Sequence, residues 1–473
     1  MKSNIPKNAK FVLPEPVFTN DKQKYYPSGD DKVKESLEKW QDYKFGLLMH
    51  WGTYSRWGVV ESWSLCPEDE DWCKRKGNDY NKYVKDYENL QNTFNPTDFA
   101  PDKWAKAGKN AGMKYMIFTT KHHDGFCMFD TKTTDYKITS DECPYHKNDD
   151  ADVLKACFDA FRAEGFSVGA YFSKPDWHND DYWWKYFPVY DRNPNYDINK
   201  YPKKWDNFVK FTHKQIDELM TNYGKVDILW LDGGWVNCVD APEPSAKFKQ
   251  VNHQSQDIKM QEIAKNARNK QPGILIVDRA VEGPFQDYLT PENTIPDEPL
   301  GVPWETNLVS GGGYSYTPNA KYKAGKEVIK ILIDIVAKGG NLLLNIAPSP
   351  LGDYDEAAYK MLNQIGNWMN VNGNCIYNTR SVTPYKQDNI YFTHSRFDGI
   401  LYAIYIRDEE PIPDEIVINN FKLKAAEIGI LGTDLSVAYV QNDDKIFIDI
   451  SKIDKTALDK TAFVFAIETK ANK

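Results

Sequence analysis

Six short apolar runs alternate with helix-like stretches between about residues 44 and 346. The runs share a nearly continuous apolar character and are FGLLMHWG (45–52), YMIFTTKHHDG (115–125), SVGAYFS (167–173), DILWLDGGW (227–235), ILIVDRA (274–280) and NLLLNIAPS (341–349). Strands of this kind suit a parallel sheet that is covered on both faces. The alternation therefore predicts an α/β fold, most economically a (β/α)8-type, TIM-like barrel. A doubly wound sheet is the alternative, although no GxGxxG or GxxxxGK[ST] motif opens a helix.

A different pattern begins near residue 376. The segment NIYFTHSRFDGILYAIYI (389–406) indicates two strands around an Asp398-Gly399 turn. The later runs alternate apolar and polar residues without helices between them, and are EIVINNF, ILGTDLSVAYV, KIFIDIS and TAFVFAIE. This pattern predicts an antiparallel β-sandwich at 376–473, behind a catalytic barrel at 1–375.

The composition narrows the possible ligands. The chain has 68 acidic and 59 basic residues, and this acidic balance argues against nucleic-acid binding. No apolar run approaches the roughly 18 residues of a membrane span, and no signal peptide is visible. The 14 Trp, 29 Tyr and 23 Phe suit a sugar or another neutral polar ligand. Oligomeric state, and whether Met1 is the native start, stay open.

Residues that can carry chemistry gather where the predicted strands end. Barrel enzymes place their catalytic groups at the carboxyl ends of strands. In chain order, these ends provide His50-Trp51, His122-His123-Asp124, Tyr171, Asp176-Trp177-His178, Trp230, Asp232, Asp278-Arg279 and Asn345. We expect a functional pocket there. Because adjacent strand residues point to opposite faces, His122 and His123 do not suggest a metal site, and we expect no metal and no cofactor.

Asp232 is the best-placed carboxylate. It follows the buried run ILWL, and Gly233 and Gly234 behind it allow a sharp turn and the close approach of a ligand. Glycoside hydrolysis needs a second carboxyl group to protonate the leaving oxygen. The candidates are Glu61, Glu282, Glu292, Glu298 and Glu305, and composition alone does not choose among them.

Several blocks resemble one enzyme family. KFGLLMHWGTYS, MKYMIFTTKHHDGFCMFDTK, GAYFSKPDWH, VDILWLDGGW and GGNLLLNIAPSPLG are similar to the retaining α-L-fucosidases of glycoside hydrolase family 29. The resemblance covers about residues 40–370, and a glycan-degrading bacterium is the expected source. It implies an exo-acting hydrolase that removes terminal α-L-fucose from oligosaccharides or glycoconjugates by double displacement. Family members often carry a β-sandwich behind the barrel.

The resemblance also implies roles for individual residues. Asp232 matches the nucleophile. Glu292, in Thr290-Pro291-Glu292, matches the acid/base of one branch, with Glu298 and Glu305 as the next candidates. The substrate-binding residues that it implies are His50, Glu61, Trp63, His122, His123, Tyr171, Trp230 and Arg279. Glu61-Ser62-Trp63 has one residue more than the family's acidic-Trp element. We expect Trp235 or Trp304 to form an apolar wall for the C5 methyl group of fucose.

Two other functions remain open at the level of sequence. One is a related retaining exo-glycosidase for another terminal sugar, and the other is a non-catalytic sugar-binding barrel. The sequence does not indicate the preferred linkage or whether branched substrates are required. We expect a periplasmic or extracellular location, since fucosylated glycans are commonly met there.

Overall fold

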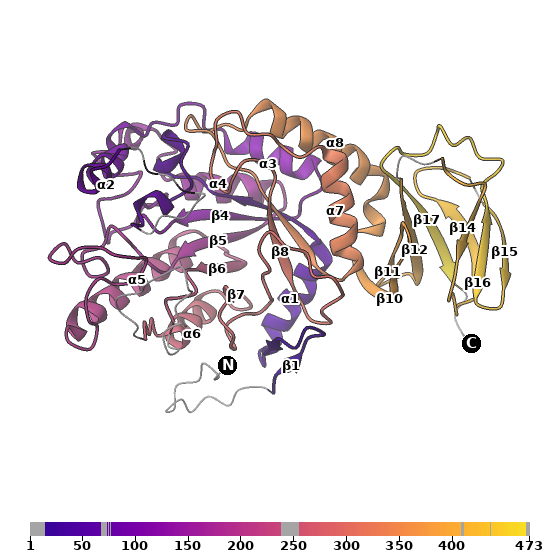
Figure 1. Cartoon of the computed structure of the whole chain (residues 1–473), viewed down its shortest axis with the longest axis horizontal. Coiled ribbons are helices and arrows are strands. Elements are labelled where there is room, and N and C mark those ends of the chain that lie inside the picture. The colour runs from indigo at the N-terminus through magenta and orange to yellow at the C-terminus, as the bar shows by residue number, and fades with distance from the viewer. Residues whose placement is uncertain are drawn as a thin grey trace.

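The computed structural model describes residues 15–67, 73, 75, 77–237, 255–407, 411–435 and 437–469. A barrel formed by most of the chain lies beside two antiparallel sheets near the C-terminus (Figure 1). Every residue that the sequence singled out for catalysis or binding lies in the barrel part of the chain, on its strands or in the segments between its elements. Among the described residues, no helix is long and apolar enough to cross a membrane.

Seven parallel strands form the central sheet, in the order β7-β6-β5-β4-β3-β9-β8. They are β3 (Phe45–Met49), β4 (Tyr115–Lys121), β5 (Ser167–Ser173), β6 (Ile228–Asp232), β7 (Leu275–Asp278), β8 (Glu305–Val309) and β9 (Asn341–Asn345). Each of the six predicted runs contains one of these strands, which confirms the TIM-like barrel. The sequence did not predict β8.

An irregular segment, 285–293, lies between β7 and β8 in the barrel wall. On one side, Asp278 N donates to Phe285 O over 2.8 Å. On the other side, Asn293 N donates to Asn307 O over 2.9 Å. This segment takes the place that an eighth strand holds in a regular barrel, and it carries Glu292.

Helices cover the outside of the sheet (Figure 1). They are α1 (Asp31–Tyr43), α3 (Pro101–Asn110), α4 (Val153–Ala163), α5 (Pro202–Asn222), α6 (Met260–Lys270), α7 (Gly325–Ala337) and α8 (Glu356–Asn372), while α2 (Tyr80–Glu88) lies apart from them near the strand ends. In α7, Val328, Leu332 and Ile335 recur at spacings of three and four residues and are buried against the sheet. The Asp152 side chain caps α4 by accepting a hydrogen bond from Lys155 N.

The C-terminal strands form two antiparallel sheets, as predicted for a sandwich. The five-stranded sheet has the order β10-β11-β12-β17-β14, and the three-stranded sheet has the order β13-β16-β15. Their bounds are β10 (Thr379–Gln387), β11 (Ile390–Ser395), β12 (Ile400–Ile406), β13 (Glu415–Ile418), β14 (Ala425–Ile430), β15 (Ala438–Asn442), β16 (Lys445–Asp449) and β17 (Ala462–Thr469). The expected hairpin joins β11 and β12 at Asp398-Gly399. β10 was not among the predicted runs.

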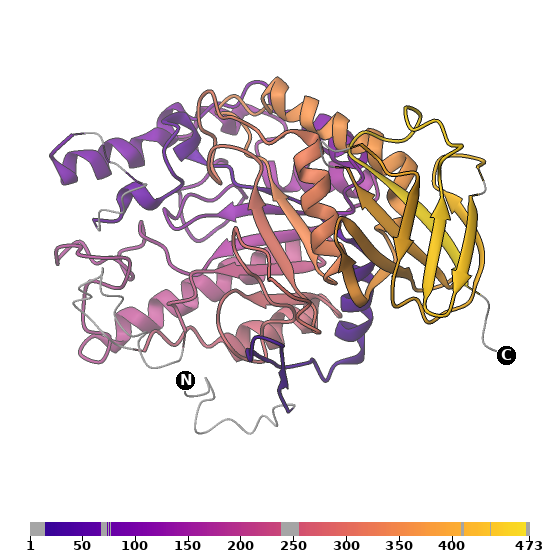
Figure 2. The same ribbon diagram turned by 45° about the vertical axis from the view of Figure 1, so that its right-hand side comes forward.

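The strand β12, in the middle of the five-stranded sheet, is largely buried on both faces. On β12, Leu401 and Ala403 belong to the core shared with the three-stranded sheet. Tyr402, Ile404 and Ile406 alternate with them and belong to the core of the barrel. Side chains therefore alternate between two cores along this strand. Figure 2 shows the five-stranded sheet between the barrel helices and the outer sheet.

Candidate active site

A cavity of about 200 Å³ opens among the carboxyl ends of the barrel strands. Its lining residues are His50, Glu61, Trp63, His122, Tyr171, Arg192, Trp230, Asp232, Trp235, Arg279, Glu292, Asn307 and Tyr314. The volume lies below the roughly 300–1,000 Å³ of sites for drug-sized ligands. A cavity of this size suits a single small polar ligand such as one sugar ring.

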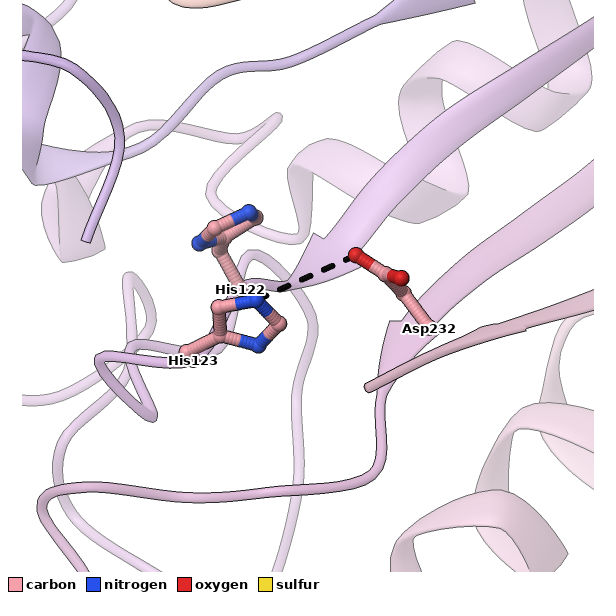
Figure 3. Close-up of side chains that lie close together, drawn as sticks. All are labelled: His122, His123 and Asp232. Carbon is pink, nitrogen blue, oxygen red and sulfur yellow. Dashed lines mark ion pairs between the residues drawn. The ribbon is translucent and has the colours of Figure 1, made fainter. Parts of the chain in front are cut away.

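Three groups converge on Asp232, the last residue of β6. Tyr171 OH donates to Oδ2 over 2.7 Å, and Arg279 Nη1 donates to Oδ1 over 2.9 Å. His123 Nε2 lies 3.8 Å from Oδ2 (Figure 3). Burial opposes the ionisation of Asp232, but Arg279, His123 and Tyr171 together hold its pKa well below the usual range. Asp232 is therefore an ionised carboxylate at neutral pH.

Arg279 also contacts Glu292. Its Nη1 donates to Asp232, while its Nη2 contacts Oε2 of Glu292. The Asp232 side chain is 15% exposed and that of Glu292 is 46% exposed. One guanidinium thus contacts Asp232 at the floor of the cavity and the carboxyl group of Glu292 at its solvent edge.

Glu61 is a third carboxyl group in the cavity. It is buried, and its Oε1 accepts a hydrogen bond of 2.6 Å from Ser315 N. Burial raises the pKa of Glu61 to about 8, which favours its neutral form at neutral pH. Its backbone φ of 31° lies in the left-handed region, which is uncommon for a residue other than glycine.

The other three candidate glutamates do not line the cavity. Glu282 pairs with Lys24 over 3.3 Å, in a groove outside the cavity that Glu298 also lines. Glu305 is buried beneath Trp230, whose Nε1 lies 3.3 Å from its Oε1. The geometry therefore leaves Glu292 and Glu61 as possible partners for Asp232.

The imidazoles are buried and mostly fixed by hydrogen bonds. His50 Nδ1 lies 3.0 Å from Asn345 Oδ1, and His122 Nδ1 lies 2.6 Å from Ser62 Oγ. Burial lowers the pKa of His50 to about 4 and that of His123 to about 3. Neutral imidazoles can donate and accept hydrogen bonds, as recognition of sugar hydroxyls requires.

The expectation that His122 and His123 point to opposite faces was wrong. Both follow the end of β4, where strand alternation no longer applies, and their ring centres are 4.2 Å apart. Each can place one ligand atom, together with one from Asp232, within 4.8 Å of the others (Figure 3). A metal ion bound by these three residues would compete with Arg279 for the Asp232 carboxylate, which argues against a metal at this place. That the protein needs no metal stays a prediction.

Aromatic rings form one side of the cavity. The Trp63 ring centre lies 5.2 Å from that of His123, and Trp235 lies 5.2 Å from the same imidazole. Trp230 stacks on Tyr171 with ring centres 5.3 Å apart. The expectation for Trp304 was wrong: it precedes β8, is buried beside Gly340 at the opposite end of the barrel, and does not line the cavity.

Sequence reasoning missed Arg192, Asn307 and Tyr314. The Arg192 guanidinium lies over the rings of Trp63 and Trp235, at 4.9 and 5.1 Å from their centres. Arg192 and Tyr314 come from loops, where no strand end marks them, and Asn307 lies on the unpredicted β8. The aromatic segment GGGYSY was the only visible signal, for Tyr314.

A TIM-like barrel whose strand ends bring together paired carboxylates, imidazoles and aromatic rings defines a glycoside hydrolase site. A family model described as alpha-L-fucosidase matches residues 13–374. Tissue alpha-L-fucosidase of Bos taurus is 27% identical over 406 residues, covering 83% of this chain and 80% of that protein. The chain belongs to the α-L-fucosidase family, glycoside hydrolase family 29.

Solved structures agree with this assignment. Alpha-L-fucosidase isoenzyme 1 from Paenibacillus thiaminolyticus is 28% identical, with a TM-score of 0.75, and covers 93% of this chain and 100% of its own. The Thermotoga maritima alpha-fucosidase in complex with a mechanism-based inhibitor is 25% identical, with a TM-score of 0.70, and covers 94% of this chain and 100% of its own.

Proposed function

We propose that the chain is an exo-acting, retaining α-L-fucosidase in which Asp232 is the nucleophile. The observation that carries this proposal is the position of Asp232, ionised and oriented by Tyr171 and Arg279 at the floor of a cavity for one sugar. A carboxylate that is ionised and oriented in this way can act as the nucleophile toward an anomeric carbon. The substrate is a fucosylated oligosaccharide or glycoconjugate, met outside the cytoplasm.

Glu292 is the acid/base in this proposal. In the first step, an oxygen of Asp232 bonds to the anomeric carbon while the bond to the leaving oxygen breaks and Glu292 gives that oxygen a proton. In the second step, Glu292 takes a proton from water, the water oxygen bonds to the anomeric carbon, and Asp232 is released. Two displacements give net retention. Because the Glu292 side chain is exposed at the edge of the cavity, it can contact both the leaving group and the incoming water.

The remaining cavity residues orient the sugar. The neutral imidazoles of His50, His122 and His123 provide hydrogen-bond partners for the ring hydroxyls. Trp235 provides apolar surface for the C5 methyl group. These contacts contribute to rate where they strengthen as the transition state forms.

Glu61 is the rival acid, because burial keeps it protonated at neutral pH. Its carboxyl group is held by Ser315 in the interior, whereas the acid/base must also activate water. Replacement of each carboxyl group, followed by rescue with azide, distinguishes the two assignments.

Release of p-nitrophenol from its α-L-fucoside should fall by several orders of magnitude in Asp232→Ala and should fall strongly in Glu292→Ala. Azide added to Asp232→Ala should give the inverted β-fucosyl azide, because azide replaces the nucleophile. Azide added to Glu292→Ala should give the retained α-fucosyl azide, because it attacks the fucosyl-enzyme. Glu298→Ala is the matched control, since its side chain lies outside the cavity.

Rescue of Glu61→Ala with retention, and not of Glu292→Ala, would reassign the acid/base. Full activity of Asp232→Ala would refute the nucleophile. A wild type that hydrolyses neither aryl fucoside nor fucosylated oligosaccharides would refute the proposed function.

A further inference from the structure

A buried carboxyl group lies inside the barrel, one layer beneath the cavity. Glu305 is the first residue of β8 and is completely buried. Its Oε2 accepts a hydrogen bond of 2.6 Å from Tyr115 OH on β4. Its Oε1 accepts one of 3.3 Å from Trp230 Nε1 on β6. Glu305 therefore connects strands from three parts of the barrel wall.

Trp230 connects this carboxyl group to the reacting centre. The Trp230 ring stacks on Tyr171 at 25° between ring planes, and the guanidinium carbon of Arg279 lies 5.5 Å from the Trp230 ring centre. Tyr171 and Arg279 are the residues that donate hydrogen bonds to the two oxygens of Asp232. Both donors thus contact one indole ring, whose edge is held by Glu305.

The cost of burying the Glu305 carboxyl group argues against packing as its only role. A carboxyl group taken out of water is costly unless hydrogen bonds replace its hydration, and an apolar side chain would fill the same space at lower cost. Among the described residues, no basic side chain forms an ion pair with Glu305. Burial raises its pKa to about 7, so it is partly neutral at neutral pH. What Glu305 provides, and an apolar residue could not, is a fixed direction for the indole N–H.

We propose that Glu305 is a positioning residue: it fixes the Trp230 ring and thereby the directions in which Tyr171 and Arg279 donate to Asp232. This inference rests on the proposed role of Asp232 as the nucleophile. Its effect should appear in the step in which Asp232 attacks the sugar, because a small misplacement of catalytic groups slows that step strongly.

The test is the rate at which 2-fluorofucosyl fluoride labels the enzyme, followed by intact mass. The 2-fluoro substituent slows release of the sugar, so the labelling rate reports the attack by Asp232. Glu305→Leu should label roughly 10- to 100-fold more slowly than wild type. Glu305→Gln should label within about threefold of wild type, because its amide oxygen can accept from Trp230 and its NH₂ can donate to the Tyr115 hydroxyl.

Tyr115→Phe is the matched control. It removes a hydrogen bond from the same buried group but leaves the contact between Glu305 and Trp230, so it should lower the melting temperature without slowing the labelling. If Glu305→Leu does not fold, Glu305→Met replaces it, since the unbranched side chain adapts to irregular space.

Labelling of a folded apolar variant at the wild-type rate would overturn the proposal. It would also be overturned if Tyr115→Phe were as slow as Glu305→Leu, or if neither apolar variant folded, because Glu305 would then serve the fold alone. A wild type that turns over no fucoside would instead contradict the proposed function.

Discussion

Tyr171 donates a hydrogen bond of 2.7 Å to Oδ2 of Asp232 from the neighbouring strand of the barrel. The two strands are paired in register, with Tyr171 opposite Trp230, two residues before Asp232. The direction of the phenol is therefore set by the sheet and does not depend on a loop. Strand pairing thus contributes directly to the geometry of the proposed nucleophile.

Replacement of Tyr171 by Phe should lower kcat/KM by roughly 10- to 100-fold, since a hydrogen bond to a charged group contributes about 1.5–3 kcal/mol. Steady-state kinetics on p-nitrophenyl α-L-fucoside measures this. A variant with unchanged kcat/KM would show that Arg279 alone orients Asp232.

Arg279→Met should move the acid limb of the kcat/KM profile to higher pH. In the wild type, Arg279 helps hold the pKa of Asp232 below its usual range, so Asp232 stays ionised in mild acid. Without this charge the effect of burial is less opposed, so the pKa of Asp232 rises and the ionised nucleophile is lost at higher pH. Arg396→Met is the control, because Arg396 pairs with the part-exposed Glu38 and Asp42 and does not line the cavity. An acid limb that stays in place would contradict the assignment.

Glu61→Gln should become more stable relative to the wild type as pH rises. The pKa of Glu61 is about 8 in the folded protein against 4.5 ordinarily, so its stabilising effect is complete below about 4.5 and is lost as pH rises toward 8. Gln keeps the acceptor for Ser315 N and does not ionise. Urea denaturation at pH 5 and pH 8 should show a difference of a few kcal/mol at most, since one pKa unit corresponds to about 1.4 kcal/mol. A constant difference would refute the shift.

Lys121→Met should lower the free energy of unfolding by about 3–5 kcal/mol, because it leaves the buried Asp176 without its ion-pair partner. Lys121 Nζ lies 3.0 Å from Asp176 Oδ2, and the two side chains are 0% and 2% exposed. Lys82→Met, which breaks an exposed pair with Asp86, should cause no measurable change. Urea denaturation of both variants decides this, and equal effects would contradict it.

The sequence predicted the parts of the site that follow apolar strands. Asp232 could be placed because the short apolar run ILWL predicts a buried strand, and the carboxyl ends of parallel strands meet at one edge. β8 was missed because its residues, Glu305, Thr306 and Asn307, are polar although buried. Glu305 accepts hydrogen bonds from β4 and β6, whereas the Thr306 and Asn307 side chains bond to Pro291, Thr294 and Tyr314, which lie outside the strands. These partners are distant in the sequence or lie in loops, so no local pattern marks β8.

The lack of a local sequence pattern also explains why segment 285–293 and the position of Trp304 were not predicted. Segment 285–293 has no strand periodicity and closes the barrel only through hydrogen bonds to β7 and β8. The position of Glu292 could therefore come from the family resemblance but not from the pattern. Trp304 was assigned to the cavity by its residue type alone, and the unpredicted strand places it at the other end.

The alternation of side chains along β12 determines whether the barrel and the C-terminal sheets can be separated. Because one face of the five-stranded sheet completes the barrel core, cutting the chain between Cys375 and Thr379 would uncover apolar surface on both fragments. Neither piece should remain in solution on its own, and fusion partners or truncations should keep the two together. The five-stranded sheet therefore covers part of the barrel core, and the C-terminal region cannot be replaced without a substitute for that apolar contact.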